Sequence, residues 1–205
     1  MKPRRWLFIA LGITTGLIGS LVLTRVSPVS PEDGWIPDSP FLPDPLPPPT
    51  LLLTDHEGRP FDLRELRGRP VAVFFGYTFC PDVCPVTMAN LTRAAADLGT
   101  EGVRLAIVFV SVDPARDTPE VLTRFRSAFG TPIITVTGSE EHLREQAAGF
   151  GVTFRIGAGE TEYTVDHSAR TYLLDGEGRI IGTLPPLPSP TQAAVSLRAF
   201  LERVR

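Results

Sequence analysis

The chain contains little sulfur and almost no lysine. Its 205 residues include two cysteines and two methionines, and Lys2 is the only lysine, so arginine carries nearly all of the positive charge. The net charge is -3 and no basic run extends beyond Arg4 and Arg5, which excludes a basic nucleic-acid-binding surface. The arginine bias, together with 21 prolines, is typical of a GC-rich bacterial genome.

A long uncharged segment stands near the N-terminus. Residues 6–24 carry no charge over 19 positions, WLFIALGITTGLIGSLVLT. A helix of that length spans about 28 Å, which matches the hydrocarbon core of a bilayer. Basic residues precede the segment, while only Arg25 follows it before Glu32 and Asp33, and this bias places the N-terminus in the cytoplasm. We expect residues 1–26 to be a cytoplasmic basic stub and a single-pass transmembrane anchor in a bacterial inner membrane.

The rest of the chain is then expected in the periplasm. A cleaved signal peptide would also export it, but the sequence offers no clear pair of small residues for a cleavage site.

Residues 27–50 contain nine prolines and are predicted to form an extended, semi-rigid linker. Residues 51–205 are close to the commonest size of a domain and are predicted to fold.

The predicted domain is of the α/β class. Residues 71–78 and 103–113 are continuous apolar, β-branched runs, which are typical of strands buried on both faces of a sheet. A helix at Val86–Leu98 separates them and completes a βαβ unit. The sequence further predicts helices at 117–129 (capped by Asp117 or Thr118), 139–149 and 191–204, a strand at 132–137, and a hairpin at 170–184 that turns at 175–178. A buried sheet with helices on both faces follows.

Both cysteines lie in one motif, FGYTFCPDVCP, at residues 75–85. The motif follows the first predicted strand, and Pro85 fits the first turn of a helix, so we expect Cys80 and Cys84 at a helix N-terminus with both sulfurs facing outward. Unpaired N–H groups and the positive end of the helix dipole favour thiolate over thiol there. Both residues are predicted to be good nucleophiles and metal ligands.

The spacing of the two cysteines leaves several uses open. A structural disulfide would suit an exported protein, but a ring this short removes little entropy from the unfolded chain. A redox dithiol and a copper site are the other uses. Zinc usually needs two further Cys or His ligands.

The three histidines differ in their settings. His56 lies in the polar turn TDHEGR and His142 among charged residues of a predicted helix, so both are predicted to be solvated. His167 lies in YTVDHSART at the entry to a predicted strand, where a loop could reach the cysteine turn. Two thiolates and one imidazole suit Cu(I) and leave room for a weak fourth ligand on Cu(II). Its position alone does not distinguish two roles for His167, that of a metal ligand and that of a structural histidine.

Two acidic residues are candidates for the surroundings of the cysteines. Asp82 lies between them and either tunes their charge, contacts a partner or serves as a turn residue. Asp113 ends the second buried strand, and the carboxyl ends of parallel strands lie side by side, so it is expected near the cysteine turn. Capping of the turn that follows is its alternative role.

Three segments together resemble the Sco/SenC family of membrane-anchored, thioredoxin-like proteins, which take part in assembling the binuclear copper centre of cytochrome c oxidase. The segments are FFGYTFCPDVCP, VFVSVDPARDTPEVLTRF and VDHSARTYLLDGEGRI, in the family's order. The resemblance implies a thioredoxin-like fold and copper, as Cu(I) or Cu(II), bound by Cys80, Cys84 and His167. It also implies that the two cysteines cycle between dithiol and disulfide. Many members have histidine before the first cysteine, where this chain has Phe79, so one possible outer ligand is missing.

The resemblance leaves two functions of different class. A metallochaperone would pass copper to subunit II of cytochrome c oxidase, with another copper chaperone as a possible donor. A thiol-disulfide oxidoreductase would keep the oxidase's copper-ligand cysteines reduced, with a thioredoxin-like reductant as partner. A thiol peroxidase is disfavoured, because peroxiredoxins carry threonine three residues before the reactive cysteine and this chain has Tyr77 there.

Overall fold

The computed structural model of the chain describes residues 40–159, 162–186 and 189–205. The predicted transmembrane anchor at 6–24 and the first part of the linker, residues 27–39, lie outside the described residues. Within the described ranges, no helix combines the length and the apolar character needed to cross a bilayer.

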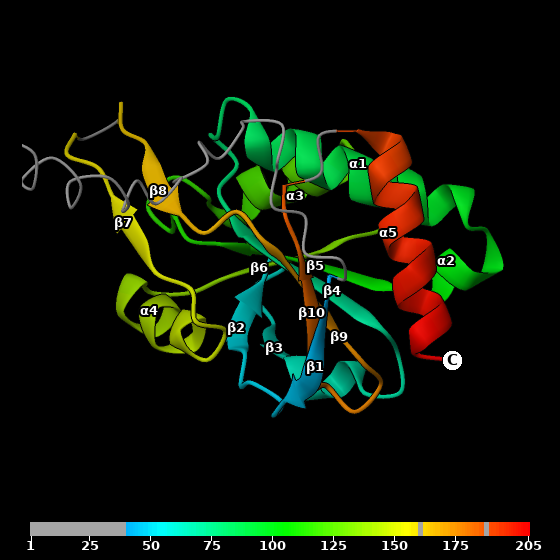
Figure 1. Cartoon of the computed structure of the whole chain (residues 1–205). Coiled ribbons are helices and arrows are strands. Elements are labelled where there is room, and N and C mark those ends of the chain that lie inside the picture. The colour runs from blue at the N-terminus through cyan, green and yellow to red at the C-terminus, as the bar shows by residue number, and fades with distance from the viewer. Residues whose placement is uncertain (1–39, 160–161, 187–188) are drawn as a thin grey trace, which may run out of the picture. The chain divides into compact units, whose positions relative to one another are not determined.

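A mixed eight-stranded sheet forms the centre of the domain (Figure 1). The strand order is β1-β10-β9-β4-β5-β6-β2-β3. The parallel core strands are β4 (Val71–Gly76), β5 (Ala106–Ser111) and β6 (Ile134–Thr137). The flanking antiparallel strands are β9 (Thr171–Leu174) and β10 (Ile180–Leu184) on one side and β2 (Leu52–Asp55) and β3 (Pro60–Asp62) on the other.

The two predicted core strands are buried along their whole length. Every residue of β4 and β5 is buried, as expected where helices or loops cover both faces of a sheet. Successive side chains of β4 point to opposite faces. Phe74 stacks on Phe109 of β5 on one face, with ring centroids 6.3 Å apart, whereas Phe75 contacts Phe150 and Tyr172 on the other. Aromatic packing therefore fills both sides of the sheet.

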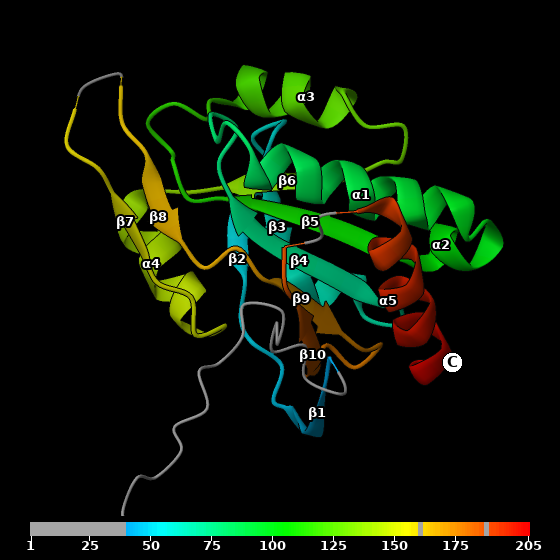
Figure 2. The ribbon, with the colours of Figure 1, turned by 45° about the horizontal axis from the view of Figure 1, so that its top comes forward.

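Helices cover both faces of this sheet. α1, α3 and α5 lie on one face and α4 on the other (Figures 1 and 2). On α1, the buried residues Cys84, Met88, Leu91 and Ala95 recur at helical spacing and so define the face that packs on the sheet. The predicted α/β sheet with helices is confirmed. The helices are α1 (Val83–Asp97), α2 (Thr100–Arg104), α3 (Pro119–Ser127), α4 (Glu140–Ala148), α5 (Pro190–Arg203) and the 3-10 turn η1 (Leu63–Leu66).

One predicted strand boundary was wrong, and one hairpin was missed. Residues 103–105 do not begin a strand, because the short helix α2 ends at Arg104 and leaves Val103 78% exposed. The hairpin of β2 and β3 was not predicted. Its turn is closed by Asp55, whose carboxylate accepts hydrogen bonds from the amides of Glu57 and Arg59.

His56 is not solvated as predicted. It is 8% exposed, and its Nε2 lies 2.9 Å from Nη1 of Arg126. The turn of β2 and β3 holds its backbone against β6, where the His56 amide donates to the Thr135 carbonyl. His56 therefore has a structural role in the described domain.

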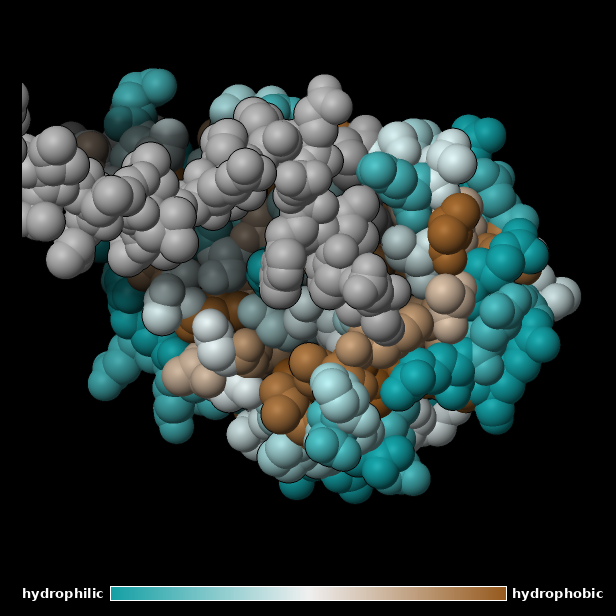
Figure 3. Space-filling view, viewed as in Figure 1, coloured by the Kyte–Doolittle hydropathy of each residue, from teal (hydrophilic) through white to brown (hydrophobic). Residues whose placement is uncertain are grey.

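The predicted linker ends earlier than residue 50. Residues Phe41–Leu46 form β1, which pairs with β10 through an irregular register. Prolines cannot donate to a ladder and are tolerated at a sheet edge or bulge, which explains Pro43 and Pro45 in this strand. Hydrophobic residues gather at the surface in the region of β1 (Figure 3), where Leu46 is 51% exposed.

The folded domain should therefore be more stable when β1 is retained. We expect a chain that begins at Leu51 to melt at a lower temperature than one that begins at Pro40, because β10 becomes an unprotected edge and the core loses the packing of Phe41. Thermal unfolding and light scattering of the two chains measure this difference. Equal melting temperatures and equal solubility would show that β1 is dispensable.

Candidate metal centre

The cysteine motif lies where β4 gives way to α1. β4 ends at Gly76, and α1 begins at Val83 with Asp82 as its N-cap residue. Pro85 lies in the first turn of α1, where a missing N–H leaves no hydrogen bond unmade. The predicted position of the motif at a helix N-terminus is confirmed.

The two sulfurs differ in exposure. Cys80 lies in the turn and is half-buried, and its Sγ accepts a hydrogen bond from the Cys84 amide at 3.5 Å. Cys84 is 0% exposed, because it belongs to the face of α1 that also buries Met88 and Leu91. The expectation that both sulfurs face outward was therefore wrong for Cys84.

A glycine provides the space for the buried sulfur. A Cβ at Gly76 would stand 2.9 Å from Sγ of Cys84 and 2.8 Å from Cε1 of Phe74. Any side chain at this position would collide with both groups. A lone glycine in a buried strand can signal such a close approach, and the sequence analysis did not use this signal.

His167 reaches the cysteines from a separate hairpin. β7 (Phe154–Ile156) and β8 (Val165–His167) form a two-stranded sheet of their own, which lies apart from the main sheet (Figure 1). His167 ends β8, and its Nε2 lies 3.5 Å from Sγ of Cys84. The rings of Phe74 and Tyr77 meet the imidazole edge-on, with centroids 6.2 and 5.9 Å away. These contacts aim Nε2 at the sulfur.

The environment changes the pKa values of all three side chains. Burial raises the pKa of the Cys84 thiol far above its ordinary range, so this residue is a thiol in the absence of metal. Burial also acts against the Cys80 thiolate, but hydrogen bonds from the amides of Asp82 and Cys84 outweigh it and lower the pKa of Cys80. Burial lowers the pKa of His167, which keeps its imidazole neutral and able to bind a metal.

The predicted ligands are close but do not yet converge. Cys84 and His167 are in contact, and Cys80 adjoins them through the Cys84 amide. Among the residues that the structure describes, no three His, Cys, Asp or Glu side chains are arranged to hold a metal ion as they stand. Two sulfurs and a neutral imidazole nonetheless form a donor set of the kind that soft metal ions prefer.

The two predicted acidic residues have different surroundings. Asp82 is exposed, and its side chain makes no capping hydrogen bond at α1. Asp113 is fully buried and its carboxylate binds two groups: Nε of Arg116 at 2.6 Å and the hydroxyl of Tyr163 at 2.7 Å. The structure thus places Asp113 in a buried ion pair, and a direct role of either acid at the cysteines stays a prediction.

Sequence reasoning missed the arginine of that ion pair. The guanidinium carbon of Arg116 lies over the rings of Tyr163, Phe79 and Tyr77, at 3.6, 4.9 and 5.7 Å from their centroids. These side chains line an open groove beside the cysteine turn, together with Pro81. Phe79, which directly precedes Cys80, is 54% exposed there.

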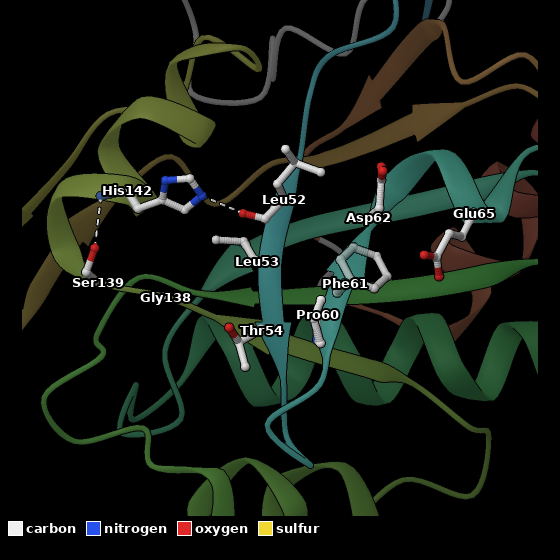
Figure 4. Close-up of a pocket in the computed structure, with 10 residues that line it drawn as sticks. All are labelled: Leu52, Leu53, Thr54, Pro60, Phe61, Asp62, Glu65, Gly138, Ser139 and His142. Atoms are coloured by element: carbon white, nitrogen blue, oxygen red, sulfur yellow. Dashed lines mark hydrogen bonds between the residues drawn. The ribbon is translucent and has the colours of Figure 1, made fainter.

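A second hollow lies between the β2–β3 hairpin and α4 (Figure 4). His142 faces it, but its Nε2 is already 2.6 Å from the carbonyl oxygen of Leu52. Ser139 caps α4 by accepting a hydrogen bond from the His142 amide. None of the predicted ligands lines this hollow, so it is not part of the candidate centre.

The sequence and the fold are similar to those of known proteins. The model of the SCO1/SenC family matches residues 49–202. This chain belongs to the SCO1/SenC family. Among curated relatives, the SCO2-like protein RP587 of Rickettsia prowazekii is 36% identical over 130 residues, which are 62% of this chain and 63% of that protein. Protein SenC of Rhodobacter capsulatus is 34% identical over 143 residues, which are 69% of this chain and 65% of that protein. The chain thus spans just under two thirds of these relatives' lengths.

Solved SCO1/SenC structures have the same fold. Copper-bound ScoI of Bradyrhizobium japonicum is 30% identical, with a TM-score of 0.68 over 77% of this chain and 99% of that chain. Apo Sco1 of Thermus thermophilus is 36% identical, with a TM-score of 0.69 over 80% of this chain and 95% of its own. The predicted thioredoxin-like α/β fold of this SCO1/SenC domain is confirmed.

The two cysteines should react very differently with an alkylating agent. Iodoacetamide should modify Cys80 and spare buried Cys84 in the native chain. Because only thiolate reacts and the pKa of Cys80 is lowered, the rate at Cys80 should reach half its maximum at a lower pH in the native chain than in the denatured chain. Fragmentation mass spectrometry locates the modification. The denatured chain is the control and should be modified at both cysteines, whereas equal rates in the native chain would contradict the asymmetry.

Replacement of Gly76 should disturb the centre. We expect Gly76→Ala to destabilise the domain by about 1–3 kcal/mol, because its Cβ overlaps the Cys84 sulfur and the Phe74 ring. Gly130→Ala is a matched control, since a Cβ at Gly130 meets no atom within 4 Å. Denaturant unfolding compares the two variants. Equal stability of the two variants would disprove the close packing at Gly76.

Proposed function

We propose that this chain is a copper-binding assembly factor for the binuclear copper centre of cytochrome c oxidase, a metallochaperone that carries copper on Cys80, Cys84 and His167. The observation that carries this proposal is the 3.5 Å contact between Sγ of Cys84 and Nε2 of His167, which joins residues 83 positions apart. Relatives support it, because the ScoI structures of Bradyrhizobium japonicum and Arabidopsis thaliana are described as having copper bound.

The donor set favours copper over zinc. Soft sulfur ligands stabilise Cu(I), and a set of two sulfurs and one imidazole leaves the coordination incomplete, whereas structural zinc sites usually have four ligands. Binding requires the Cys80 side chain to turn toward the Cys84–His167 pair and requires Cys84 to lose its proton to the solvent. The accessible Cys80 is then the ligand that an incoming donor or acceptor protein reaches first.

Delivery would proceed by ligand exchange. A cysteine or histidine of the acceptor would replace Cys80 first, and the buried ligands would release the ion last. In this proposal the acceptor is subunit II of the oxidase, and another copper chaperone supplies the ion. The domain would stand in the periplasm, held by the N-terminal anchor and the proline-rich linker.

A thiol-disulfide reductase is the second candidate, and the asymmetry of the cysteines favours it specifically. The Cys80 thiolate would attack a disulfide of the partner and release one partner thiolate. Cys84 would then attack the mixed disulfide, which frees the second partner thiol and leaves a Cys80–Cys84 disulfide. A thioredoxin-like reductant would return the two electrons and two protons.

His167→Ala separates the two candidates. Removal of the imidazole should weaken copper binding at least tenfold, because one of three ligands is lost, while thiol-disulfide exchange should continue. Titration of the full-length chain with Cu(I) and Cu(II), reduced and oxidised, measures the first effect, and reduction of a model disulfide measures the second. His142→Ala is the matched control, since His142 lies in the other hollow.

Either of two results would change the conclusion. Copper binding by His167→Ala that equals the wild type would disprove the three-ligand site. Normal oxidase assembly with His167→Ala, combined with failure of Cys80→Ser and Cys84→Ser, would favour the reductase.

A further inference from the structure

The candidate centre is assembled from two pieces that share no sheet. The cysteines belong to the β4–α1 connection, whereas His167 belongs to the β7–β8 hairpin, whose strands pair only with each other within the described part of the chain. An isolated two-stranded hairpin is marginally stable by itself. Side-chain contacts must therefore hold this hairpin against the cysteine turn if His167 is to stay beside Cys84.

Arg144 of α4 makes one such contact, a hydrogen bond from Nη1 to the Phe154 carbonyl oxygen of β7 at 2.9 Å. A second group contacts both the hairpin and the cysteine turn, and we name it the Arg116 cluster: Asp113, Arg116, Tyr163 and Phe79. Asp113 fixes Arg116 from the end of β5 through the ion pair at 2.6 Å. Arg116 then makes two contacts with Tyr163. Its guanidinium carbon lies 3.6 Å from the centroid of the Tyr163 ring, and its Nη1 donates a hydrogen bond to the Tyr163 carbonyl oxygen at 2.9 Å. Tyr163 returns a hydrogen bond from its hydroxyl to Asp113 at 2.7 Å.

The cluster also touches the cysteine turn. The same guanidinium lies 4.9 Å from the ring centroid of Phe79 and 5.7 Å from that of Tyr77. Phe79 directly precedes Cys80 in the chain, and Tyr77 packs edge-on against the imidazole of His167. Arg116 thus contacts both pieces of the centre, although it is not a candidate ligand.

We propose that Arg116 is a positioning residue for His167, which acts by holding the β7–β8 hairpin against the cysteine turn through Tyr163. A planar guanidinium is needed for this role, because one side chain must pair with a carboxylate, donate to a carbonyl and stack on an aromatic ring. Lysine would keep the charge opposite Asp113 but lose the stacking and the directed bond to the hairpin. This inference rests on the proposed copper function, in which His167 is a ligand.

Two variants test the role of Arg116 in the full-length chain. Arg116→Lys keeps the buried charge pair, and Tyr163→Leu removes the ring and the hydroxyl that the hairpin contributes to the cluster while leaving Arg116 and Asp113 paired. Arg126→Lys is the matched control, because Arg126 is also partly buried and donates to a backbone carbonyl, that of Ile133 at 3.2 Å, but does so away from the hairpin. If one of these two variants fails to fold, the other still tests the proposal.

The expected effect is a loss of imidazole ligation. Arg116→Lys and Tyr163→Leu should each weaken Cu(II) binding about 10- to 100-fold, as replacement of residues that orient metal ligands usually does. The nitrogen hyperfine coupling of His167 in the electron paramagnetic resonance spectrum of the Cu(II) complex should weaken with it. In metal-free protein, amide hydrogen exchange should accelerate in β7 and β8 and stay unchanged in β4 and α1. Arg126→Lys should show neither change.

Three outcomes decide the matter. Wild-type affinity and an unchanged nitrogen signal in both cluster variants would overturn the positioning role, provided that His167→Ala does lose affinity. Exchange that accelerates equally across the whole domain would also overturn it, since this is the result of a purely structural role. If His167→Ala itself binds copper like the wild type, the proposed function fails first, and the role of Arg116 at the metal fails with it.

Discussion

The burial of one sulfur determines the arrangement of the whole centre. Cys84 packs on the sheet with the apolar face of α1, and this is possible only because Gly76 lacks a side chain. The buried sulfur meets His167, while Cys80 stays at the surface on the amides of the helix N-terminus. Two cysteines four positions apart therefore have opposite environments: burial raises the pKa of Cys84, whereas amide hydrogen bonds lower the pKa of the more accessible Cys80.

The centre also depends on a contact between separate parts of the fold. Strands β4 and β5 are fixed by the buried sheet, but among the residues that the structure describes, the hairpin that carries His167 has no partner strand in that sheet. Side chains hold it in place, and the buried ion pair of Asp113 and Arg116 is one of these contacts. Under the proposed positioning role, the placement of His167 would thus depend on an arginine 51 residues earlier in the chain, with Tyr163 as the link.

Local patterns predicted the elements and missed the contacts between them. β4, β5, α3 and α4 follow from apolar runs and from the caps Thr118 and Ser139, which are readable in the sequence. The turns DHEGR and DGEGR are built alike, with Asp55 and Asp175 each accepting from the amides two and four residues on, yet only the second was interpreted as a hairpin. Arg116 and Tyr163 lie 47 residues apart, and no periodicity reports such a pair. The link between His167 and the cysteines came from the family resemblance.

The unequal exposure of the sulfurs has a consequence for oxidative damage. Peroxide in the surroundings can reach Cys80 but not Cys84, so the first oxidation product is a sulfenic acid at Cys80. The neighbouring Cys84 thiol can condense with it to a disulfide and water. This reaction stops the oxidation of Cys80 before the irreversible sulfinic acid forms. The buried cysteine would then protect Cys80 from irreversible oxidation, in addition to the ligand role proposed for it.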